Sequence, residues 1–107
     1  MSFECITEIP NFTQEKYDEV RGKMGLDSPN AQWPQGLIHH CAGSLDNGTW
    51  CIVEEWETRE DFQRFCDSQP KDPQMMAEMG QIVQRWFPVY NEYHSPGEQD
   101  IGLRRAA

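Results

Sequence analysis

Side chains that can transfer protons occur in two short stretches of this 107-residue chain. His39 and His40 are adjacent, and Glu54 stands two residues before Trp56 in an apolar stretch. An imidazole changes charge near neutral pH, so either histidine can serve as an acid, a base or a hydrogen-bond donor to a carbonyl group. A carboxylate buried on an apolar strand face without a cation becomes a stronger base, as general-base catalysis requires. We therefore treat His40, His39 and Glu54 as candidate catalytic residues.

Each candidate also has a structural interpretation. Histidines in strands often do no more than satisfy neighbouring polar groups. Glu54 is an ordinary surface acid if its end of the strand is solvated. The side chains on the same strand face decide between these interpretations, because alternate residues of a strand point to opposite faces.

The two histidines and Glu54 belong to the two arms of an expected hairpin. Its turn is expected within residues 44–48, where Asp46-Asn47-Gly48 indicates a hairpin because Asn and Gly tolerate positive φ. The sequence allows a two-residue turn or a four-residue loop. Both registers predict that His39 shares a face with Glu54, whereas His40 shares the opposite face with Glu55. A bulge would break this rule.

The elements around the hairpin alternate between strands and helices. Thr13 is a good N-cap for a first helix that ends at Gly25, and Thr58 caps a second helix with Glu60 and Asp61 in its first turn. The expected strands cover residues 3–9, 36–43, 49–57 and 86–94. This β-α-β-β-α-β order predicts an α+β fold, a ferredoxin-like sandwich with one four-stranded antiparallel sheet.

The second helix is interrupted by Pro70 and Pro73, and Pro73 can open a further helical piece. Apolar residues beyond it are expected to continue the buried stripe, namely Met75, Met76, Met79, Ile82 and Val83. Residues 1–94 then form a single domain, and residues 95–107 a polar C-terminal tail.

The strand at residues 49–57 has apolar side chains on both faces. Trp50, Ile52 and Trp56 lie on one face, and Cys51 and Val53 on the other. The helices of one chain cover only one face, and an apolar share of 37% is low for a self-sufficient monomer. A homodimer that packs sheet against sheet would cover the second face.

The charge balance excludes several classes of partner. Eighteen acidic against nine basic residues give a formal net charge of −9. Nucleic acids and anionic membranes both attract basic surfaces, so neither is an expected partner. No stretch approaches the roughly 18 apolar residues of a membrane span. The N-terminus shows no basic start and no apolar signal core, so we expect a cytoplasmic protein.

The four cysteines, Cys5, Cys41, Cys51 and Cys66, show no CxxC spacing. Their neighbours are mostly apolar, which favours buried free thiols. The three histidines and four cysteines form no ligand cluster in the sequence, so no metal site is expected.

Aromatic residues are dense, with four Trp, five Phe and three Tyr. Most aromatic side chains are core residues by default, but four Trp exceed what packing asks for in so small a domain. We therefore expect an aromatic-lined pocket between sheet and helices that holds a small apolar molecule. The candidate substrate-binding residues are Trp56, Trp50, Phe62, Phe65, Tyr90 and Asn91. Tyr90 and Asn91 offer a phenol and an amide to a ligand, or lie at a dimer seam.

Several motifs carry a likeness to a known family. They are Ile9-Pro10-x-x-Thr13 with Tyr17-Asp18-x-Val20, Gly36-Leu37-Ile38-x-His40, Trp56-Glu57-x-Arg59-Glu60-x-Phe62-x-x-Phe65 and Pro88-Val89-x-Asn91. Over about residues 3 to 93 the chain resembles small bacterial proteins of the dimeric α+β barrel superfamily, in the group that includes the antibiotic biosynthesis monooxygenases. The Trp-x-Thr/Ser-x-Glu/Asp-x-Phe stretch is the most specific part, and it marks the superfamily rather than one reaction.

The resemblance implies a range of activities. Members of the superfamily include cofactor-free oxygenases acting on polycyclic aromatic substrates, haem-degrading oxygenases, cyclases, isomerases and proteins with no assigned activity. His40 matches a histidine of this subgroup, and Trp56 is retained. The antibiotic monooxygenases typically place an asparagine four residues before that tryptophan, where this chain has Ile52. Haem-degrading members usually use a helix histidine, and the expected helices contain none, so no cofactor is expected.

Two functions fit these residues. One is a small cofactor-independent enzyme acting on an apolar aromatic or polyketide-like molecule, as a monooxygenase or as a cyclase or isomerase by proton transfer. His39 or His40 would be its acid or base, with Glu54 as partner and Trp56 as a pocket wall. The alternative is a non-catalytic, small-molecule-binding or stress-associated homodimer. A binder needs only an apolar cavity whose polar groups are all satisfied by the protein.

Overall fold

The computed structural model describes residues 1–26, 29, 31–69, 73, 77 and 81–95. The elements follow the predicted order, with bounds β1 (Phe3–Ile9), α1 (Gln14–Lys23), β2 (Leu37–Ser44), β3 (Trp50–Trp56), α2 (Arg59–Ser68) and β4 (Val83–Pro88). Neighbouring strands are antiparallel in the order β2-β3-β1-β4. This is the split βαβ arrangement, and the predicted ferredoxin-like α+β fold is confirmed.

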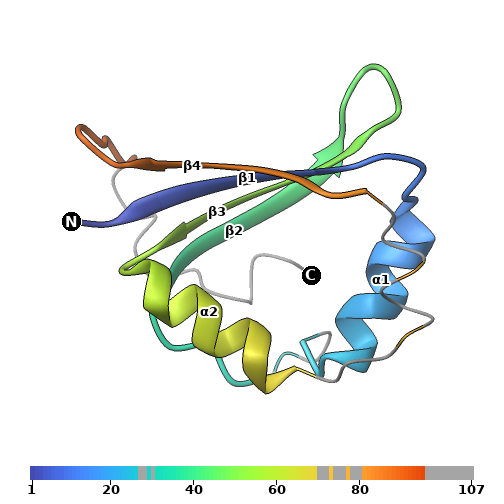
Figure 1. Ribbon diagram of the computed structural model, residues 1–107, viewed down its shortest axis with the longest axis horizontal. Helices are drawn as coiled ribbons and strands as arrows, with labels where there is room; N and C mark the ends of the chain where they lie inside the picture. Colours follow the sequence, from blue (N-terminus) through green and yellow to red (C-terminus); the bar gives the residue numbers. More distant parts are fainter. Residues whose placement is uncertain (27–28, 30, 70–72, 74–76, 78–80, 96–107) are drawn as a thin grey trace.

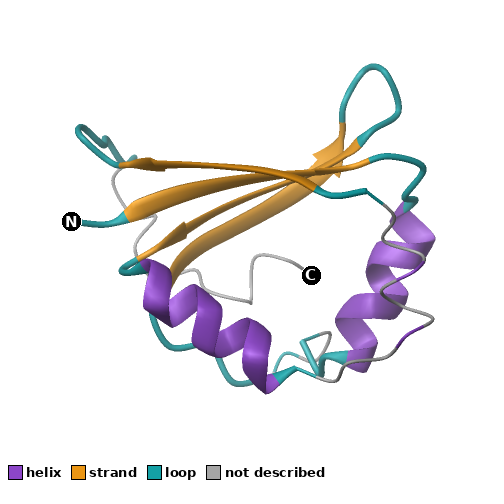
Figure 2. Cartoon of the chain, viewed as in Figure 1, coloured by secondary structure: helices purple, strands orange, loops and turns teal. Residues whose placement is uncertain are grey.

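The two helices lie on the same side of the sheet, α2 beneath one end and α1 beneath the other (Figure 1). We call this side the helix face, which carries Cys5, Thr7 and Ile9 of β1. The other side is the open face, which carries Glu4 and Glu8 of β1. No helix of the described residues covers the open face (Figure 2). The sheet therefore has one sheltered side and one bare side.

The core of the helix face has two parts, one under each helix. Near α1, Ile9, Phe12 and Trp50 form a buried cluster. Near α2, the fully buried Trp56 packs against Phe62, with ring centroids 5.6 Å apart. Each helix thus anchors one end of the sheet through apolar side chains.

Both predicted N-caps are confirmed. The Thr13 hydroxyl oxygen accepts a hydrogen bond from the Lys16 backbone N–H at 3.1 Å, and Thr58 does the same for Asp61 at 3.0 Å. At the end of α1, Gly25 adopts a φ of 75°, a left-handed conformation that costs glycine little. These local signals need only neighbouring residues, which is why the sequence reveals them.

The hairpin register differs from both predicted registers. The Leu45 backbone N–H donates to the Thr49 carbonyl at 2.8 Å, so residues 46–48 form a three-residue loop with Gly48 at a φ of 86°. Three-residue loops of this kind place their last residue in the left-handed region. A three-residue loop shifts the register by one residue relative to the predicted two-residue and four-residue loops. Each side chain of β2 therefore faces the opposite set of β3 side chains from the one predicted. His40 therefore pairs with Glu54 and His39 with Glu55, and the predicted grouping of His39 with Glu54 is wrong.

The last strand begins and ends earlier than predicted. It covers Val83–Pro88 instead of residues 86–94, because its partner strand β1 begins at Phe3, opposite Pro88. Ile82 and Val83 are exposed, so the predicted buried stripe does not reach them. Met75, Met76 and Met79 lie outside the described residues. The expected tail at 95–107 does so as well, except for residue 95.

The open face leaves apolar side chains in contact with solvent. Val83 and Phe87 of β4 are exposed, as are Tyr90 and Tyr93 beyond it. Of the cysteines, Cys5 is buried as predicted, whereas Cys41 is exposed on β2. Within the described part of the chain, no helix is long and apolar enough to cross a membrane.

Candidate functional site

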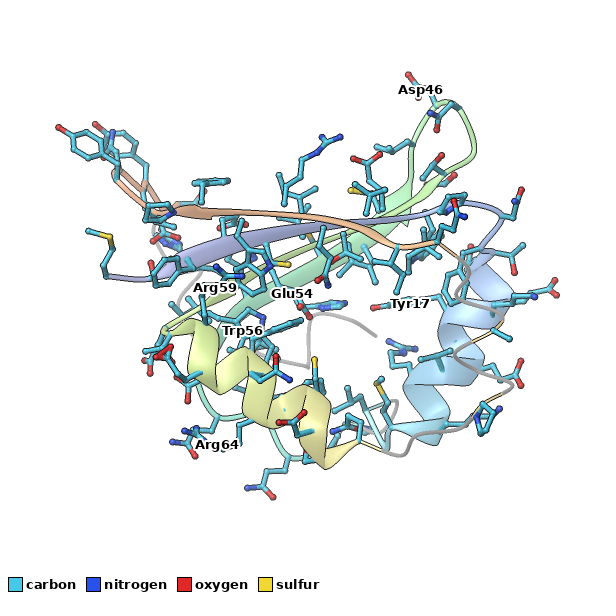
Figure 3. The ribbon with its side chains drawn as sticks, viewed as in Figure 1. Tyr17, Asp46, Glu54, Trp56, Arg59 and Arg64 are labelled. Atoms are coloured by element: carbon cyan, nitrogen blue, oxygen red, sulfur yellow. The ribbon has the colours of Figure 1, made fainter. Side chains whose placement is uncertain are left out.

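A continuous chain of polar side chains lies on the helix face. His40 Nδ1 lies 2.7 Å from Glu54 Oε2, and the Trp56 indole N–H donates to Glu54 Oε1 at 3.2 Å. His40 Nε2 lies 2.5 Å from the Tyr17 hydroxyl oxygen. The residues come from β2, β3 and α1, and their labelled members Tyr17 and Glu54 point toward one another between the two helices (Figure 3).

The carboxylate determines the direction of these hydrogen bonds. An ionised Glu54 only accepts, so Nδ1 of a neutral His40 carries the proton and donates it. Nε2 is then an acceptor for the Tyr17 hydroxyl. The Trp56 indole N–H donates to the second carboxylate oxygen, so each oxygen of Glu54 has a hydrogen-bond partner. The carboxylate is thereby held in place and orients the His40 imidazole. This is the arrangement by which a carboxylate selects the tautomer of a catalytic histidine.

Tyr17 is the group of this cluster that sequence analysis missed as a functional residue. Its ring packs against Trp50 at a centroid distance of 5.1 Å. Burial raises the pKa of its phenol above the ordinary value of 10.0, so the hydroxyl stays protonated near neutral pH. The signal in the sequence was weak, because Tyr17 has the helical spacing of a core residue. Only the packing of α1 against the hairpin brings it to His40.

The predicted aromatic residues fall into two groups. Trp56, Phe62 and Phe65 form one cluster between β3 and α2, whereas Trp50 packs under α1. Tyr90 and Asn91 are exposed beyond β4, apart from both groups.

Two hollows flank α2. One, of about 370 Å³, is bordered by Met24, Leu26, Trp33 and Phe65, and the other, of about 350 Å³, by Phe62 and Trp86 among others. Neither hollow is lined by the polar chain of Tyr17, His40 and Glu54. The side chains of His40 and Glu54 nevertheless keep 28% and 16% of their surface exposed, so both are in partial contact with solvent.

His39 lies on the open face, away from these residues. Its Nε2 is 3.4 Å from Glu4 Oε1 and 3.7 Å from Glu55 Oε1. Neither glutamate was a sequence candidate. Both predicted registers place Glu55 on the same face as His40. In the structure Glu55 shares its face with His39 instead.

No protein-family model and no curated protein sequence matches this chain. Solved structures do share its fold. Rv0793 from Mycobacterium tuberculosis aligns with a TM-score of 0.61 and 12% identity, over 88% of this chain and 100% of its own. A mutant form of SnoaB, a cofactor-independent oxygenase from Streptomyces nogalater, aligns with a TM-score of 0.55 and 10% identity, over 85% of this chain and 93% of its own.

A candidate antibiotic biosynthesis monooxygenase from Deinococcus radiodurans is similar at a TM-score of 0.55 and 12% identity, over 91% of this chain and 100% of its own. This chain therefore has the fold of these antibiotic biosynthesis monooxygenase-like proteins, as its motifs predicted.

Cofactor use differs among proteins with this fold. The haem-degrading protein Rv3592 from Mycobacterium tuberculosis aligns with a TM-score of 0.53 and 13% identity, over 88% of this chain and 100% of its own. Neither His40 nor His39 fits a haem ligand on the helix face. Both nitrogens of His40 already have partners, and His39 lies on the opposite face.

Proposed function

We propose that this chain is a small cofactor-independent enzyme that transfers a proton from an apolar, aromatic substrate on the helix face. The observation that carries this proposal is the relay from Tyr17 through His40 to Glu54. A binding protein needs no oriented imidazole between a phenol and a carboxylate.

The relay has a defined order of proton movement. A weakly acidic C–H bond of the substrate breaks, its proton passes to the Tyr17 oxygen, and the phenolic proton passes to His40 Nε2. The electron pair of the C–H bond stays on the substrate as an enolate. Glu54 stabilises the imidazolium that results, as the acid of a catalytic triad does. General acid–base catalysis of this kind contributes about 10² to 10⁴ in rate.

The surroundings favour a substrate with aromatic rings. Trp50 and Trp56 border the relay on the two sides, and Ile52 lies between them on the helix face. Ile52 replaces the asparagine of the antibiotic monooxygenases, so at that position the chain offers an alkyl group to the substrate and no amide. Recognition here depends on ring contacts more than on hydrogen bonds.

The enolate has two possible fates. Protonation at another carbon gives an isomer, whereas attack of the enolate carbon on a carbonyl carbon of the same molecule closes a ring and the resulting alkoxide takes up the proton; neither outcome changes the oxidation state. Reaction with dioxygen forms a hydroperoxide that loses water to leave a ketone, consuming one O₂ for each substrate. The first fate is a cyclase or isomerase reaction, and the second a monooxygenase reaction.

The experiment is deuterium exchange at the acidic carbon of a hydroxylated tricyclic aromatic ketone. Without oxygen, the wild-type protein is expected to accelerate exchange in D₂O, measured by NMR, and His40→Asn to abolish the acceleration. His39→Asn, on the open face, is the matched control and should exchange like wild type. Adding air and recording oxygen uptake then separates the two fates.

The alternative function, a non-catalytic binder, makes a different prediction. A binder would quench tryptophan fluorescence with the same ketone but leave the exchange rate at that of buffer. That result in the wild-type protein would overturn the enzymatic proposal.

We also propose that two copies pack through their open faces. The exposed Phe87 and Val83, together with Tyr90 and Tyr93, supply the apolar surface for this contact. Light scattering should give about twice the 12.5 kDa of one chain. A particle of 12.5 kDa at micromolar concentration would contradict the dimer.

A further inference from the structure

Three ionisable side chains form one row across three neighbouring strands of the open face. Glu55 of β3 pairs directly with Glu4 of β1 on one side and with His39 of β2 on the other. Cross-strand neighbours in such a row have their Cβ atoms about 4.5 to 5.5 Å apart, so their side chains meet. The imidazole Nε2 and one oxygen from each carboxylate all lie within 4.8 Å of one another.

The row places two carboxylates opposite each other in a sheltered position. Glu55 has none of its side-chain surface exposed, and Glu4 only 14%. Like charges directly opposite in a sheet destabilise it, and buried charges are normally paired or bound to a metal. Burial accordingly raises the pKa of both carboxyls.

One oxygen of this row has no donor. The Ser2 hydroxyl donates to Glu55 Oε2 at 2.6 Å, but Glu55 Oε1 is buried and has no hydrogen-bond partner among the described residues. That oxygen faces His39 Nε2 at 3.7 Å, too far for a hydrogen bond. A buried oxygen without a donor, near an imidazole nitrogen and a second carboxylate, is a position that a cation or a shared proton would satisfy.

We propose that Glu4, His39 and Glu55 bind one divalent transition-metal ion, with Zn²⁺ and Mn²⁺ as the ions of suitable chemistry. One imidazole and two carboxylates suit such ions, which bind nitrogen and oxygen at about 2.0 to 2.2 Å. Ligand atoms around a metal at that radius lie about 3 to 3.5 Å apart. The 3.4 and 3.7 Å separations from Nε2 therefore need only a small contraction.

In the single chain the proposed site is open to solvent on the imidazole side. His39 keeps 40% of its side chain exposed there, which gives the ion a path of entry before two copies pack through their open faces. A metal ion with three protein ligands and one bound water has the coordination of catalytic metal sites. Closed structural sites have four protein ligands instead. The site lies on the face opposite the Tyr17 relay, so it takes no part in the proton transfer proposed above.

A shared proton is the competing explanation of this row. If Glu55 and Glu92 share a proton, the hydrogen bond between them lowers the pKa of Glu92 and gives the buried Glu55 carboxyl a partner. A proton held between Glu55 and Glu92 would remove the repulsion without any metal. The two explanations differ in whether a dication binds at all.

The test is calorimetric titration of the full chain, freed of metal with a chelator, using Zn²⁺ and separately Mn²⁺. We expect one ion per chain, and weakening by at least about tenfold in Glu55→Gln and in His39→Asn. His40→Asn and Glu54→Gln form the matched control pair on the helix face and should bind as wild type does. Cys41→Ser, on the same open face, should also bind normally.

Two results would overturn the proposal. One is the absence of stoichiometric binding in the folded wild-type chain, which leaves the shared proton as the explanation. The other is binding that survives Glu55→Gln but is lost in Cys41→Ser, which places the ion on the thiol. Circular dichroism of each variant establishes that it folds, and Glu55→Gln keeps the shape of the side chain. Neither result affects the deuterium-exchange test of the relay.

Discussion

His40 and Glu54 on the helix face, and His39 and Glu55 on the open face, are two copies of one cross-strand pair in adjacent rows. On the helix face, the imidazole and the carboxylate are 2.7 Å apart, and Tyr17 and Trp56 complete the hydrogen bonds. On the open face they are 3.7 Å apart, and a second carboxylate stands where a donor is needed.

The difference lies in the neighbours and not in the pair itself. The helix face supplies a phenol and an indole, which are neutral donors, whereas the open face supplies Glu4, an acceptor. The first pair is therefore satisfied within the chain, and the second requires a proton or a cation from outside. The same two residue types thus suit proton transfer on one face and cation binding on the other.

Glu→Gln substitutions on the two faces are expected to differ most in their effect on the rate of the proposed reaction. Glu54→Gln removes the acceptor that orients His40, so the deuterium-exchange rate should fall by about 10² to 10⁴. Glu55→Gln should leave that rate within about twofold, because Glu55 lies on the opposite face. Comparable losses in both variants would mean that the two faces are coupled.

The next effect concerns packing. Trp56→Ala empties the centre of the helix-face core, and the free energy of unfolding should fall by about 3 to 5 kcal/mol in a urea titration. Phe87→Ala, at 48% exposure on the open face, should cost only about 0.5 kcal/mol in a single chain. A larger loss for Phe87→Ala that depends on protein concentration would instead support the dimer.

Substitution of Glu54 and of Glu55 by Gln should change the free energy of unfolding in opposite directions when a chelator keeps the protein free of metal. Glu54→Gln leaves the His40 and Trp56 donors poorly satisfied and should destabilise the fold by about 1 to 3 kcal/mol. Glu55→Gln removes the repulsion with Glu4 and should stabilise it by up to about 1 kcal/mol. If Glu55→Gln were the more destabilising variant, Glu55 would already be satisfied without an added ion.

The smallest effect is a pH dependence that comes from Tyr17. Because burial raises the pKa of its phenol above 10.0, the unfolded chain loses this proton first as the pH rises. Stability from this residue is therefore complete below about pH 10 and declines above it. Tyr17→Phe should show a flatter loss of stability between pH 9 and 11, followed by urea unfolding. Parallel curves for the two proteins would contradict a buried, protonated phenol.

Local signals in the sequence predicted most of the fold. Thr13 and Thr58 cap their helices through residues three positions away, and the alternation in β1 requires only its own side chains. The end of β4 was misplaced by six residues, from 94 to 88, because aromatic residues beyond Pro88 resemble a strand. Among the candidate site residues, Glu54 contacts His40 and Trp56, where the predicted registers grouped it with His39, and Tyr90 and Asn91 lie apart from them.

His39 and His40 are neighbours in one strand, and Glu54 and Glu55 are neighbours in the next. Because strand side chains alternate, the sequence by itself determined that each face of the sheet receives one histidine and one glutamate. Only the tertiary structure decided which histidine meets which glutamate. A change of one residue in the length of the turn at 46–48 reverses the pairing, because a one-residue shift in register moves every side chain of a strand to the other face. The tertiary structure also brought Tyr17 to His40 and Glu4 to Glu55, since those contacts arise from packing of distant segments that no local pattern encodes.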